Sequence, residues 1–493
     1  MSEAAIRLWP ELPKARISPN IYGHFAEHLG RCVYEGIWVG PKSRIPNEQG
    51  FRLDVLAALK QLRAPVVRWP GGCFADAYHW RDGVGPQAKR PQRTNVWWAQ
   101  AEPNTFGTDE FVQLCQAVGC APYVCVNVGS GSPREAMAWL EYCNFGGDSA
   151  LSRMRDAQPY GVKYWGVGNE AWGCGGRFTA TDYAKEYVRF ASYLRAQDRS
   201  IKLVACGASP GDYRNPAFVS WNHDFCDAMP HADLIDHLSI HRYFHRGKGA
   251  AFSDGEYHAL FADLITLDRD IRQADQLLGY FYPDTFVGLA IDEWGVWHPS
   301  AVVDNGLEQE NTLRDAVFAG AALNLFNRWA HRVTMANLAQ TINVLQCLAV
   351  TDKARMHLTP TYYVFDMMRR HMGARALTDE VECPEFEAHP IGLKQRQPVP
   401  ALSVSASLAG KRIRLTVANQ TVDQDVATRI DVRGAGMASV AGHVLNAGDP
   451  RDVNTFEEPK RVFPKRLKFE GESQELVHTF PAHSFTALSI TLN

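Results

Sequence analysis

The chain carries little net charge and lacks the usual signals of a membrane or secreted protein. Its 493 residues include 51 Lys and Arg against 54 Asp and Glu, so the net charge is -3. Nucleic acids and anionic membranes attract proteins through an excess of basic residues, and this balance supports neither partner. No apolar run reaches the roughly 20 residues of a membrane span. Residues 1–7 lack the basic start and long apolar core of a signal peptide, so we expect a cytoplasmic protein.

Cysteine pairs and nucleotide-binding motifs are also missing. The 11 cysteines include no C-x-x-C pair, and several lie in apolar runs, as Cys125 does. That distribution is typical of reduced, buried thiols in a cytoplasmic protein. No G-x-G-x-x-G or P-loop sequence follows the first predicted strand, so nucleotide binding has no support. There is no solenoid-period repeat and no low-complexity segment.

What is present is an alternation of strand-length apolar runs with amphipathic segments of helical period. The predicted strands are 21–27, 66–71, 122–128, 162–170, 202–209, 234–243, 286–294 and 333–340. The predicted helices are 51–62, 108–118, 133–143, 181–196, 219–229, 258–278, 313–329 and 362–371, with Thr108 as the N-cap of the second. Near-continuous apolar strands indicate parallel pairing covered by helices. A (β/α)8 barrel is the simplest closure, and an open doubly wound sheet is the alternative.

The pattern changes after about Gly373. From Leu402 the chain shows short stretches of alternating polar and apolar residues, which is typical of a β-sandwich. We predict a (β/α)8 barrel over residues 18–374 and a jelly-roll-like β-sandwich over residues 375–493. An N-terminal strand within residues 1–17 is expected to join the sandwich.

Two glutamates, Glu170 and Glu293, each end an apolar, strand-like run. A buried carboxylate is costly unless it has a partner or a chemical role. In barrel enzymes the carboxyl ends of the strands form the active site, so the two glutamates are expected at one rim. Two carboxyls in that position can serve as the acid and the nucleophile of a glycoside hydrolase.

Polar and aromatic residues end seven of the eight predicted strands. Arg68 is expected to keep Glu293 ionised through its opposite charge, and Tyr243 can donate its hydroxyl to the same carboxylate. Asn169 can hydrogen-bond a substrate hydroxyl next to the reacting carbon. His241 is expected to support these groups, with a satisfied core histidine as the alternative.

A catalytic thiol and a metal site fit the sequence less well. Gly71 and Gly72 allow a tight turn that brings Cys73 into the site, but no Cys–His pairing is evident. The one metal-like spacing is His24-x-x-Glu27-His28, which reverses the order of H-E-x-x-H and lies at a strand end. We therefore expect no metal and no cofactor.

Several motifs in combination resemble the α-L-arabinofuranosidases of glycoside hydrolase family 51. They are FAEHLGR (25–31), YEGI (34–37), RWPGG (68–72), YHWRDGVGP (78–86), NVGSG (127–131), WGVGNE (165–170), DEW (292–294) and ANLAQ (336–340). The resemblance extends from about residue 21 to residue 484. It implies a (β/α)8 barrel with a C-terminal β-sandwich, in agreement with the periodicity. It also implies a retaining mechanism with Glu170 as acid/base and Glu293 as nucleophile.

The same resemblance implies which residues bind the sugar. The residues expected to hold the arabinofuranosyl ring are Glu27, Cys73, Asn169, Tyr243 and Gln340, and those expected to line the entrance are Trp98 and Trp297. Family members are often oligomers of stacked dimers, commonly hexamers. The loop after Glu170 departs from some relatives, since Ala171 lacks a polar side chain on the leaving-group side. Because Cys73 and Cys174 lie on adjacent loops, a redox-sensitive bridge between them is a further hypothesis.

The sequence is thus interpreted as a retaining, exo-acting α-L-arabinofuranosidase. It would release terminal arabinofuranose from arabinan or arabinoxylan oligosaccharides. The alternatives are a β-xylosidase or an endo-β-1,4-glucanase on the same scaffold. A non-catalytic carbohydrate-binding protein is disfavoured, because a retired site has no physical need for both glutamates with Arg68 and Tyr243.

Overall fold

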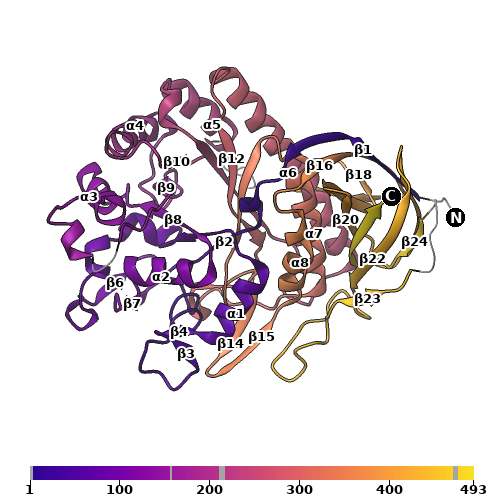
Figure 1. Cartoon of the computed structure of the whole chain (residues 1–493), viewed down its shortest axis with the longest axis horizontal. Coiled ribbons are helices and arrows are strands. Elements are labelled where there is room, and N and C mark those ends of the chain that lie inside the picture. Colours follow the sequence, from indigo (N-terminus) through magenta and orange to yellow (C-terminus); the bar gives the residue numbers. More distant parts are fainter. Residues whose placement is uncertain (1–3, 156–157, 210–216, 470–475) are drawn as a thin grey trace.

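The computed structural model describes residues 4–155, 158–209, 217–469 and 476–493, and its larger part is a closed barrel of eight parallel strands (Figure 1). The strands are β2 (Gly23–Phe25), β5 (Val66–Trp69), β8 (Ala121–Val126), β9 (Tyr164–Val167), β10 (Lys202–Ala205), β11 (His237–Phe244), β12 (Gly288–Val296) and β13 (Val333–Ala339). They follow one another round the barrel in chain order, and the last strand pairs with the first through Asn337 opposite Gly23. The predicted barrel is confirmed, and the open doubly wound sheet is excluded.

In the part of the chain that the structure describes, eight α-helices alternate with the strands and pack round them. They are α1 (Leu53–Leu62), α2 (Thr108–Val118), α3 (Pro133–Asn144), α4 (Ala180–Gln197), α5 (Ala217–Ala228), α6 (Asp254–Phe281), α7 (Leu313–Arg328) and α8 (Pro360–Met368). One predicted cap is wrong by a residue. Gly107, and not Thr108, is the N-cap of α2, and Glu110 Oε2 accepts a hydrogen bond from Gly107 N at 2.9 Å. A carboxylate in the first turn satisfies this otherwise free N–H, so no side-chain cap is required.

Several strands are shorter than predicted because the polar residues at their ends leave the ladder. The sequence predicts a strand over residues 162–170, but β9 ends at Val167. Gly168 and Glu170 then adopt positive φ angles of 80° and 41°. A positive φ turns the chain sharply away from the strand direction, and it is uncommon for a residue with a side chain. The turn carries Glu170 off the barrel wall and onto its rim.

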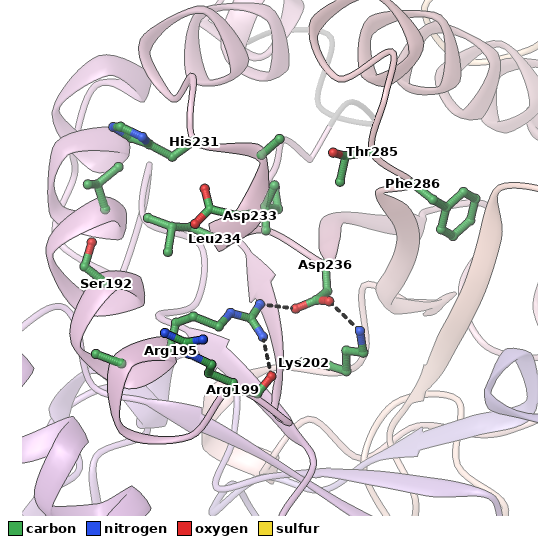
Figure 2. Close-up of a pocket in the computed structure, with 14 residues that line it drawn as sticks. Ser192, Arg195, Arg199, Lys202, His231, Asp233, Leu234, Asp236, Thr285 and Phe286 are labelled. Atoms are coloured by element: carbon green, nitrogen blue, oxygen red, sulfur yellow. Dashed lines mark hydrogen bonds and ion pairs between the residues drawn. The ribbon is translucent and has the colours of Figure 1, made fainter.

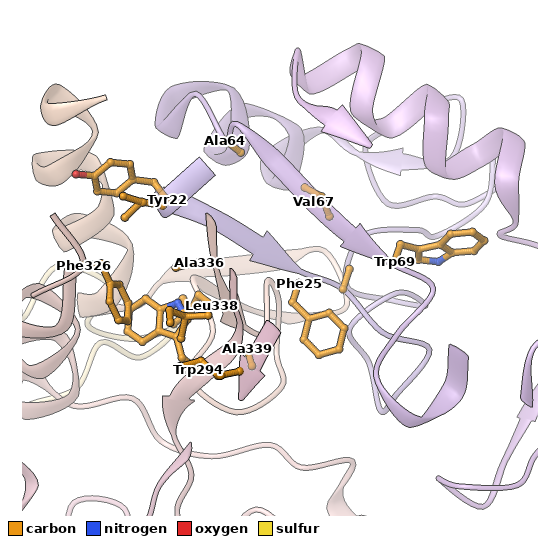
Figure 3. Packing of buried hydrophobic residues seen from close by; sticks show 14 of the residues in the cluster. Tyr22, Phe25, Ala64, Val67, Trp69, Trp294, Phe326, Ala336, Leu338 and Ala339 are labelled. Carbon is orange, nitrogen blue, oxygen red and sulfur yellow. The ribbon is translucent and has the colours of Figure 1, made fainter. Parts of the chain in front are cut away.

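The barrel core is built from apolar side chains on neighbouring strands. Figure 3 shows Phe25 of β2, Trp69 of β5 and Trp294 of β12 in this packing. The Trp294 ring meets Phe326 of α7 edge-on, with 5.2 Å between ring centroids. Each of these aromatic side chains is almost fully buried, so each removes a large apolar surface from water. The rim residues described below are attached to this rigid wall.

A nine-stranded sheet forms the C-terminal part of the molecule, with the order β23-β22-β25-β20-β19-β16-β1-β21-β24. Its strands are β1 (Ala4–Arg16), β16 (Arg375–Glu382), β19 (Leu402–Ala409), β20 (Arg412–Asn419), β21 (Val426–Val432), β22 (Met437–Leu445), β23 (Lys465–Leu467), β24 (Leu476–Phe480) and β25 (Phe485–Leu492). Strand β1 pairs antiparallel with β16 and parallel with β21. Apolar side chains from eight strands of the sheet, such as Ile6 and Leu415, form one core separate from that of the barrel. The predicted fold class, a barrel followed by a β-rich domain, is confirmed.

The two parts of the molecule meet along α7 and α8, which lie between the barrel and the sheet (Figure 1). Asn324 and Asn327 of α7 donate amide hydrogen bonds to Ser403 O at 2.9 Å and Ser405 Oγ at 3.1 Å. The domain boundary at residues 374 and 375 stays a prediction, and residues 1–3 of the predicted N-terminal strand lie outside the described residues. Within the described ranges, every helix is too short or too polar to cross a lipid bilayer.

Four short hairpins extend from these two parts. They are β3 (Asn47–Glu48) with β4 (Phe51–Arg52), β6 (Arg93–Asn95) with β7 (Gln100–Glu102), β14 (Ala349–Asp352) with β15 (Arg355–Leu358), and β17 (Glu385–Ala388) with β18 (Gln397–Pro400). The hairpin of β6 and β7 carries Trp98 between its strands. The hairpin of β14 and β15 follows β13 in the chain, after the carboxyl end of that strand.

Candidate active site

The residues singled out in the sequence meet at the carboxyl end of the barrel. Arg68 lies in β5, His241 and Tyr243 in β11, and Glu293 in β12. The remaining rim residues follow directly after strands, and they are Glu27 after β2, Asn169 and Glu170 after β9, and Gln340 after β13. The contacts below join them into two neighbouring groups, one round Glu293 and Arg68 and one round Glu27, as expected for residues that share the carboxyl rim of a barrel.

Glu293 is buried and is held by a cation, a phenol and an imidazole. Its Oε1 accepts a hydrogen bond from Arg68 Nη1 at 2.8 Å, and its Oε2 accepts one from the Tyr243 hydroxyl at 2.7 Å. Nδ1 of His241 lies 3.6 Å from Oε1. Burial works to raise the pKa of Glu293, but the positive charges of His241 and Arg68 and these hydrogen bonds outweigh it and lower the pKa. The carboxyl of Glu293 is therefore held in its ionised form.

Glu170 is partly exposed, and its contacts differ from those of Glu293. His241 Nδ1 lies 2.9 Å from Glu170 Oε1, and the sulfur of Cys174 lies 3.8 Å from Oε2. The imidazole therefore stands between the two carboxyls. Burial works to lower the pKa of His241, but the charges of Glu293 and Glu170 outweigh it and raise the pKa above its ordinary value.

Arg68 links three residues of the site. Besides Glu293 it donates through Nη2 to Asn169 Oδ1, which fixes the orientation of that amide. Its Nε lies 3.4 Å from Asp292 Oδ2. Asp292 also accepts hydrogen bonds from Tyr123 at 2.7 Å and from Asn337 at 2.7 Å. Asp292 thus balances the buried guanidinium from below, a function that the sequence did not reveal because the residue points into the wall and not the pocket.

Glu27 forms a second buried carboxyl at the rim. It accepts hydrogen bonds from Trp98 Nε1 at 2.9 Å, from Phe74 N at 3.1 Å and from Gln340 Nε2 at 3.1 Å. Burial and the negative charge of Glu293 raise the pKa of Glu27 to about 7. Glu27 therefore joins two other residues predicted to bind substrate, Trp98 and Gln340.

Cys73 and Cys174 form a disulfide, with 5.4 Å between their Cα atoms. The bridge joins the loop after β5 to the loop that carries Glu170. The hypothesis of a bridge between these two cysteines agrees with the structure, and its sensitivity to redox conditions stays a prediction. The other nine cysteines are free, and seven of them are buried. Any contact of Cys73 with a sugar is made by a disulfide sulfur, which has no hydrogen to donate.

Trp297 stands against the side of the pocket that carries Tyr243. The two rings meet at 81° with 5.1 Å between centroids. The Trp297 indole donates to Ala301 O at 3.1 Å, which ties the ring to its own loop. Trp98 thus contacts Glu27, Trp297 contacts Tyr243, and both tryptophan side chains are partly exposed.

Asp76 is a buried residue of the site that sequence reasoning missed. Its Oδ1 accepts from the backbone N–H groups of Val128 and Gly129 at 2.8 and 2.9 Å, and its Oδ2 accepts from Asn169 N at 2.7 Å. Burial raises the pKa of Asp76 to about 7, although these hydrogen bonds act in the opposite direction. The residue fixes the loops after β8 and β9 relative to each other. The motif YHWRDGVGP begins just after it, but no spacing rule pointed to this carboxyl.

The histidines near Glu27 do not form a metal site with it. Trp69 Nε1 donates to His28 Nε2 at 3.0 Å, and His28 Nδ1 lies 2.7 Å from Glu102 Oε2. Both ring nitrogens of His28 are therefore engaged by protein groups. His24 is buried against Phe365, and desolvation lowers its pKa to about 3.

A closed (β/α)8 barrel with two facing carboxyls at its carboxyl rim defines a class, the barrel-fold glycoside hydrolases. Comparison with known proteins gives the family. Residues 58–254 match the family model "Alpha-L-arabinofuranosidase 1 domain", and residues 292–484 match "Alpha-L-arabinofuranosidase C-terminal domain". The chain belongs to the α-L-arabinofuranosidases of glycoside hydrolase family 51.

Individual relatives support this assignment over the full length. The chain is 38% identical to an intracellular exo-α-L-arabinofuranosidase of Bacteroides ovatus, with 99% of this chain and 95% of that protein covered. Among solved structures, the family 51 arabinofuranosidase of Xanthomonas axonopodis pv. citri is 34% identical, with a TM-score of 0.91 over 99% of this chain and 100% of that one. The thermostable family 51 enzyme of Thermotoga petrophila is 33% identical, with a TM-score of 0.89 and the same coverage.

Proposed function

We propose that this protein is a retaining, exo-acting α-L-arabinofuranosidase. It releases terminal non-reducing arabinofuranose from arabinoxylan or arabinan oligosaccharides. The names of the relatives above support the substrate class, and the geometry of the two glutamates supports the mechanism.

The observation that carries the proposal is the short separation of the two carboxyls. One oxygen of Glu170, one of Glu293 and a ring nitrogen of His241 all lie within 4.8 Å of one another. Retaining glycosidases hold their carboxyls about 5 Å apart, whereas inverting enzymes leave about 6.5–9.5 Å for a water molecule. The spacing therefore favours direct attack by one carboxylate on the sugar.

Glu293 is the nucleophile in this proposal. Arg68, His241 and Tyr243 favour its ionised form, and a carboxylate must be ionised to attack the anomeric carbon. The attack forms a covalent glycosyl-enzyme as the bond to the leaving oxygen breaks. The tyrosine and arginine also fix the direction in which the carboxylate points.

Glu170 is the acid/base. It protonates the leaving oxygen in the first step and removes a proton from water in the second. It is exposed enough to meet the leaving group, and it has neither the Arg68 nor the Tyr243 contact that holds Glu293 ionised. His241 contacts both carboxyls. Its imidazole can therefore interact with whichever of the two glutamates is ionised in each step.

The sugar-binding roles follow from the network at the rim. Glu27, Asn169 and Gln340 offer polar atoms held by neighbouring groups, and Tyr243 and the Cys73 sulfur complete the proposed ring site. Arg68 and His241 support the reacting carboxyls. Trp98 and Trp297 would line the entrance, where aromatic faces can pack on the apolar faces of sugar rings. The reaction moves protons and one glycosyl group between carboxyls and water, so it requires no metal or cofactor.

We further propose that the enzyme is cytoplasmic and assembles as a homo-oligomer in solution, with the hexamer common in the family as the expected form. The name of the Bacteroides ovatus relative supports an intracellular location. Light scattering of the purified protein tests the assembly. A monomer at micromolar concentration would contradict it.

Hydrolysis of an aryl α-L-arabinofuranoside beside an aryl β-D-xylopyranoside tests the function. We expect a strong preference for the arabinofuranoside and its loss in Glu293→Ala. Preference for the xyloside would identify a β-xylosidase on the same scaffold. Full activity of the variant would refute Glu293 as the nucleophile.

A further inference from the structure

A second cavity opens at the same end of the barrel as the glutamates. Its volume is about 480 Å³. Its barrel-derived walls come from the segments after β11, β12 and β13, and its outer wall comes from a loop of the β-rich domain. The lining residues that carry the argument are Ser300, Asn311, Val350, His357, Val453 and Phe456. Because segments that follow barrel strands all lie at the carboxyl rim, this cavity and the active site share one face of the molecule.

The cavity lies beyond Trp297 along one loop. Ser300 follows Trp297 by three residues. Gln309, which also lines the cavity, donates to Val296 O at 3.0 Å and accepts from His298 N at 2.9 Å. These two bonds tie its wall to the end of β12, the strand that carries Glu293. The wall and Trp297 therefore belong to one segment that follows β12.

The outer wall is firmly attached to the barrel. Leu313 N, at the start of α7, donates to Asp452 O at 2.9 Å. Asn454 donates to Leu358 O at 3.0 Å and accepts from Val462 N at 2.8 Å. Phe456 packs against His357 with 4.7 Å between ring centroids. The wall is therefore preformed, which reduces the entropy lost on binding.

The chemistry of the walls suits a neutral sugar. Phe456, Val350 and Val453 offer apolar surface. Ser300 and Thr455 add hydroxyl-bearing residues to the lining. A sugar unit presents apolar C–H faces and hydroxyl groups together.

The charges of the cavity do not favour an anion. Its basic residue is Lys248, and its acidic residues are Glu308 and Glu310. Glu308 is already paired with Arg31, whose Nε and Nη2 lie 2.7 and 2.9 Å from its oxygens. The remaining charges nearly balance. A carboxylated or phosphorylated ligand would find no excess of positive charge to hold it.

We propose that this cavity is a distal subsite that binds a neutral pentose unit of the main chain to which the arabinofuranose is attached. The inference rests on the proposed function and adds a second point of attachment for branched oligosaccharides. The active site holds the terminal sugar, and the distal subsite holds the main chain some units away. Two linked contacts raise the apparent affinity for long substrates without changing the chemistry at the first.

Kinetics on short and long substrates test the proposal. In Phe456→Ala we expect the KM for a branched arabinoxylo-oligosaccharide to rise about fivefold, the size expected for one aromatic contact, with kcat unchanged. The kinetics on an aryl α-L-arabinofuranoside should stay the same, because that substrate is too short to reach the cavity. Phe463→Ala is the matched control, since Phe463 is an exposed phenylalanine of the same loop that packs on Tyr363 outside the cavity.

A binding measurement separates this proposal from the proposed function. Linear xylotetraose carries no arabinofuranose, so calorimetry with wild-type protein reports on the main-chain contact alone. We expect binding that is weakened in Phe456→Ala and retained in Phe463→Ala, even if the aryl arabinofuranoside is not cleaved. Binding of a branched arabino-oligosaccharide is compared between wild type and Phe456→Ala, because the active site contributes equally in both proteins. A difference for this ligand and not for xylotetraose would identify an arabinan main chain. Three results would overturn the distal subsite. The first is an equal change of KM in Phe456→Ala on the short and the long substrate. The second is unchanged kinetics of Phe456→Ala on both substrates together with no binding of either oligosaccharide to wild type, and the third is an altered oligomeric state in Phe456→Ala but not in Phe463→Ala.

Discussion

The two ends of the barrel differ in how completely their carboxylates are paired with positive charges. At the amino end, a cavity of about 880 Å³ is lined by charged residues from the starts of β10 and β11 and the end of α4 (Figure 2). There both carboxylate oxygens of Asp236 are paired. Lys202 Nζ lies 2.7 Å from Oδ1, and Oδ2 accepts hydrogen bonds from Arg195 and, at 2.9 Å, from Leu203 N. The pKa of Asp236 is lowered, because these bonds and charges outweigh the opposing effect of burial.

At the carboxyl end the carboxyls outnumber their cations. Glu27, Glu170 and Glu293 gather round Arg68 and His241, and burial raises the pKa of Glu27 to about 7. Asp236 and Glu293 are both paired and both have a lowered pKa. The difference is that Asp236 has two cations, whereas Glu293 shares His241 with Glu170 beside a third carboxyl, Glu27, whose pKa is raised. Groups with perturbed pKa values that crowd together in this way are typical of active sites. The paired charges at the amino end fit a structural role, and the rim with its excess of carboxyls is the candidate site.

The largest expected effect is the loss of the acid/base. In Glu170→Ala we expect kcat to fall about 1000-fold on natural oligosaccharides, whose leaving groups need a proton. Aryl substrates with good leaving groups should be affected far less in the first step. Asp236→Asn is the control from the other end of the barrel, and its kcat should match wild type. Equal losses on both kinds of substrate would remove Glu170 from the acid role.

Reducing the disulfide tests how far the stability of the carboxyl rim depends on this covalent bond. Cys73 and Cys174 are 101 residues apart. The loop-entropy model gives about 4.7 kcal/mol of stabilisation for closing a loop of that length, and about 2–4 kcal/mol is typical of disulfides. Chemical denaturation with and without reductant measures the difference. Cys174→Ser should remove the response to reductant. A wild-type protein whose stability and activity ignore both reductant and oxidant would argue against a redox-sensitive bridge.

The pH dependence of stability distinguishes the two kinds of carboxyl. The folded pKa of Glu27 is about 7, above its ordinary value of 4.5, so the folded state binds more protons than the unfolded state between these values. Stability contributed by Glu27 is fully present below pH 4.5 and is lost as the pH rises to 7, a change of roughly 3 kcal/mol. In Glu27→Gln, urea unfolding should show a smaller decline over that window than wild type.

Asp236 should show the opposite sign. Because its folded pKa is lowered, it contributes stability above its ordinary value of 3.8 that is lost as the pH falls through the folded pKa. In Asp236→Asn we expect a loss of about 1 kcal/mol at neutral pH that shrinks in acid, measured by the same urea unfolding. A loss that grew in acid would contradict the pairing.

The sequence predicted the fold and most of the rim because both depend on local pattern. Apolar runs alternating with amphipathic segments identified all eight barrel strands, and strand ends located Glu170 and Glu293. Strand limits were less accurate, since the left-handed turn at Glu170 depends on the bonds that Asp76 makes with neighbouring loops. Asp76 and Asp292 were missed for a related reason: their partners are backbone groups and side chains far away in the chain.

Trapping the glycosyl-enzyme tests the central claim most directly. The enzyme is treated with a 2-fluoro arabinofuranosyl fluoride, which forms the covalent intermediate but slows its hydrolysis, and the digested protein is analysed by mass spectrometry. We expect one equivalent of sugar on the peptide that contains Glu293, and none in Glu293→Ala. A label on Glu170, Glu27 or any other residue, or turnover of the substrate with inversion and no adduct, would contradict the assignment of Glu293 as the nucleophile.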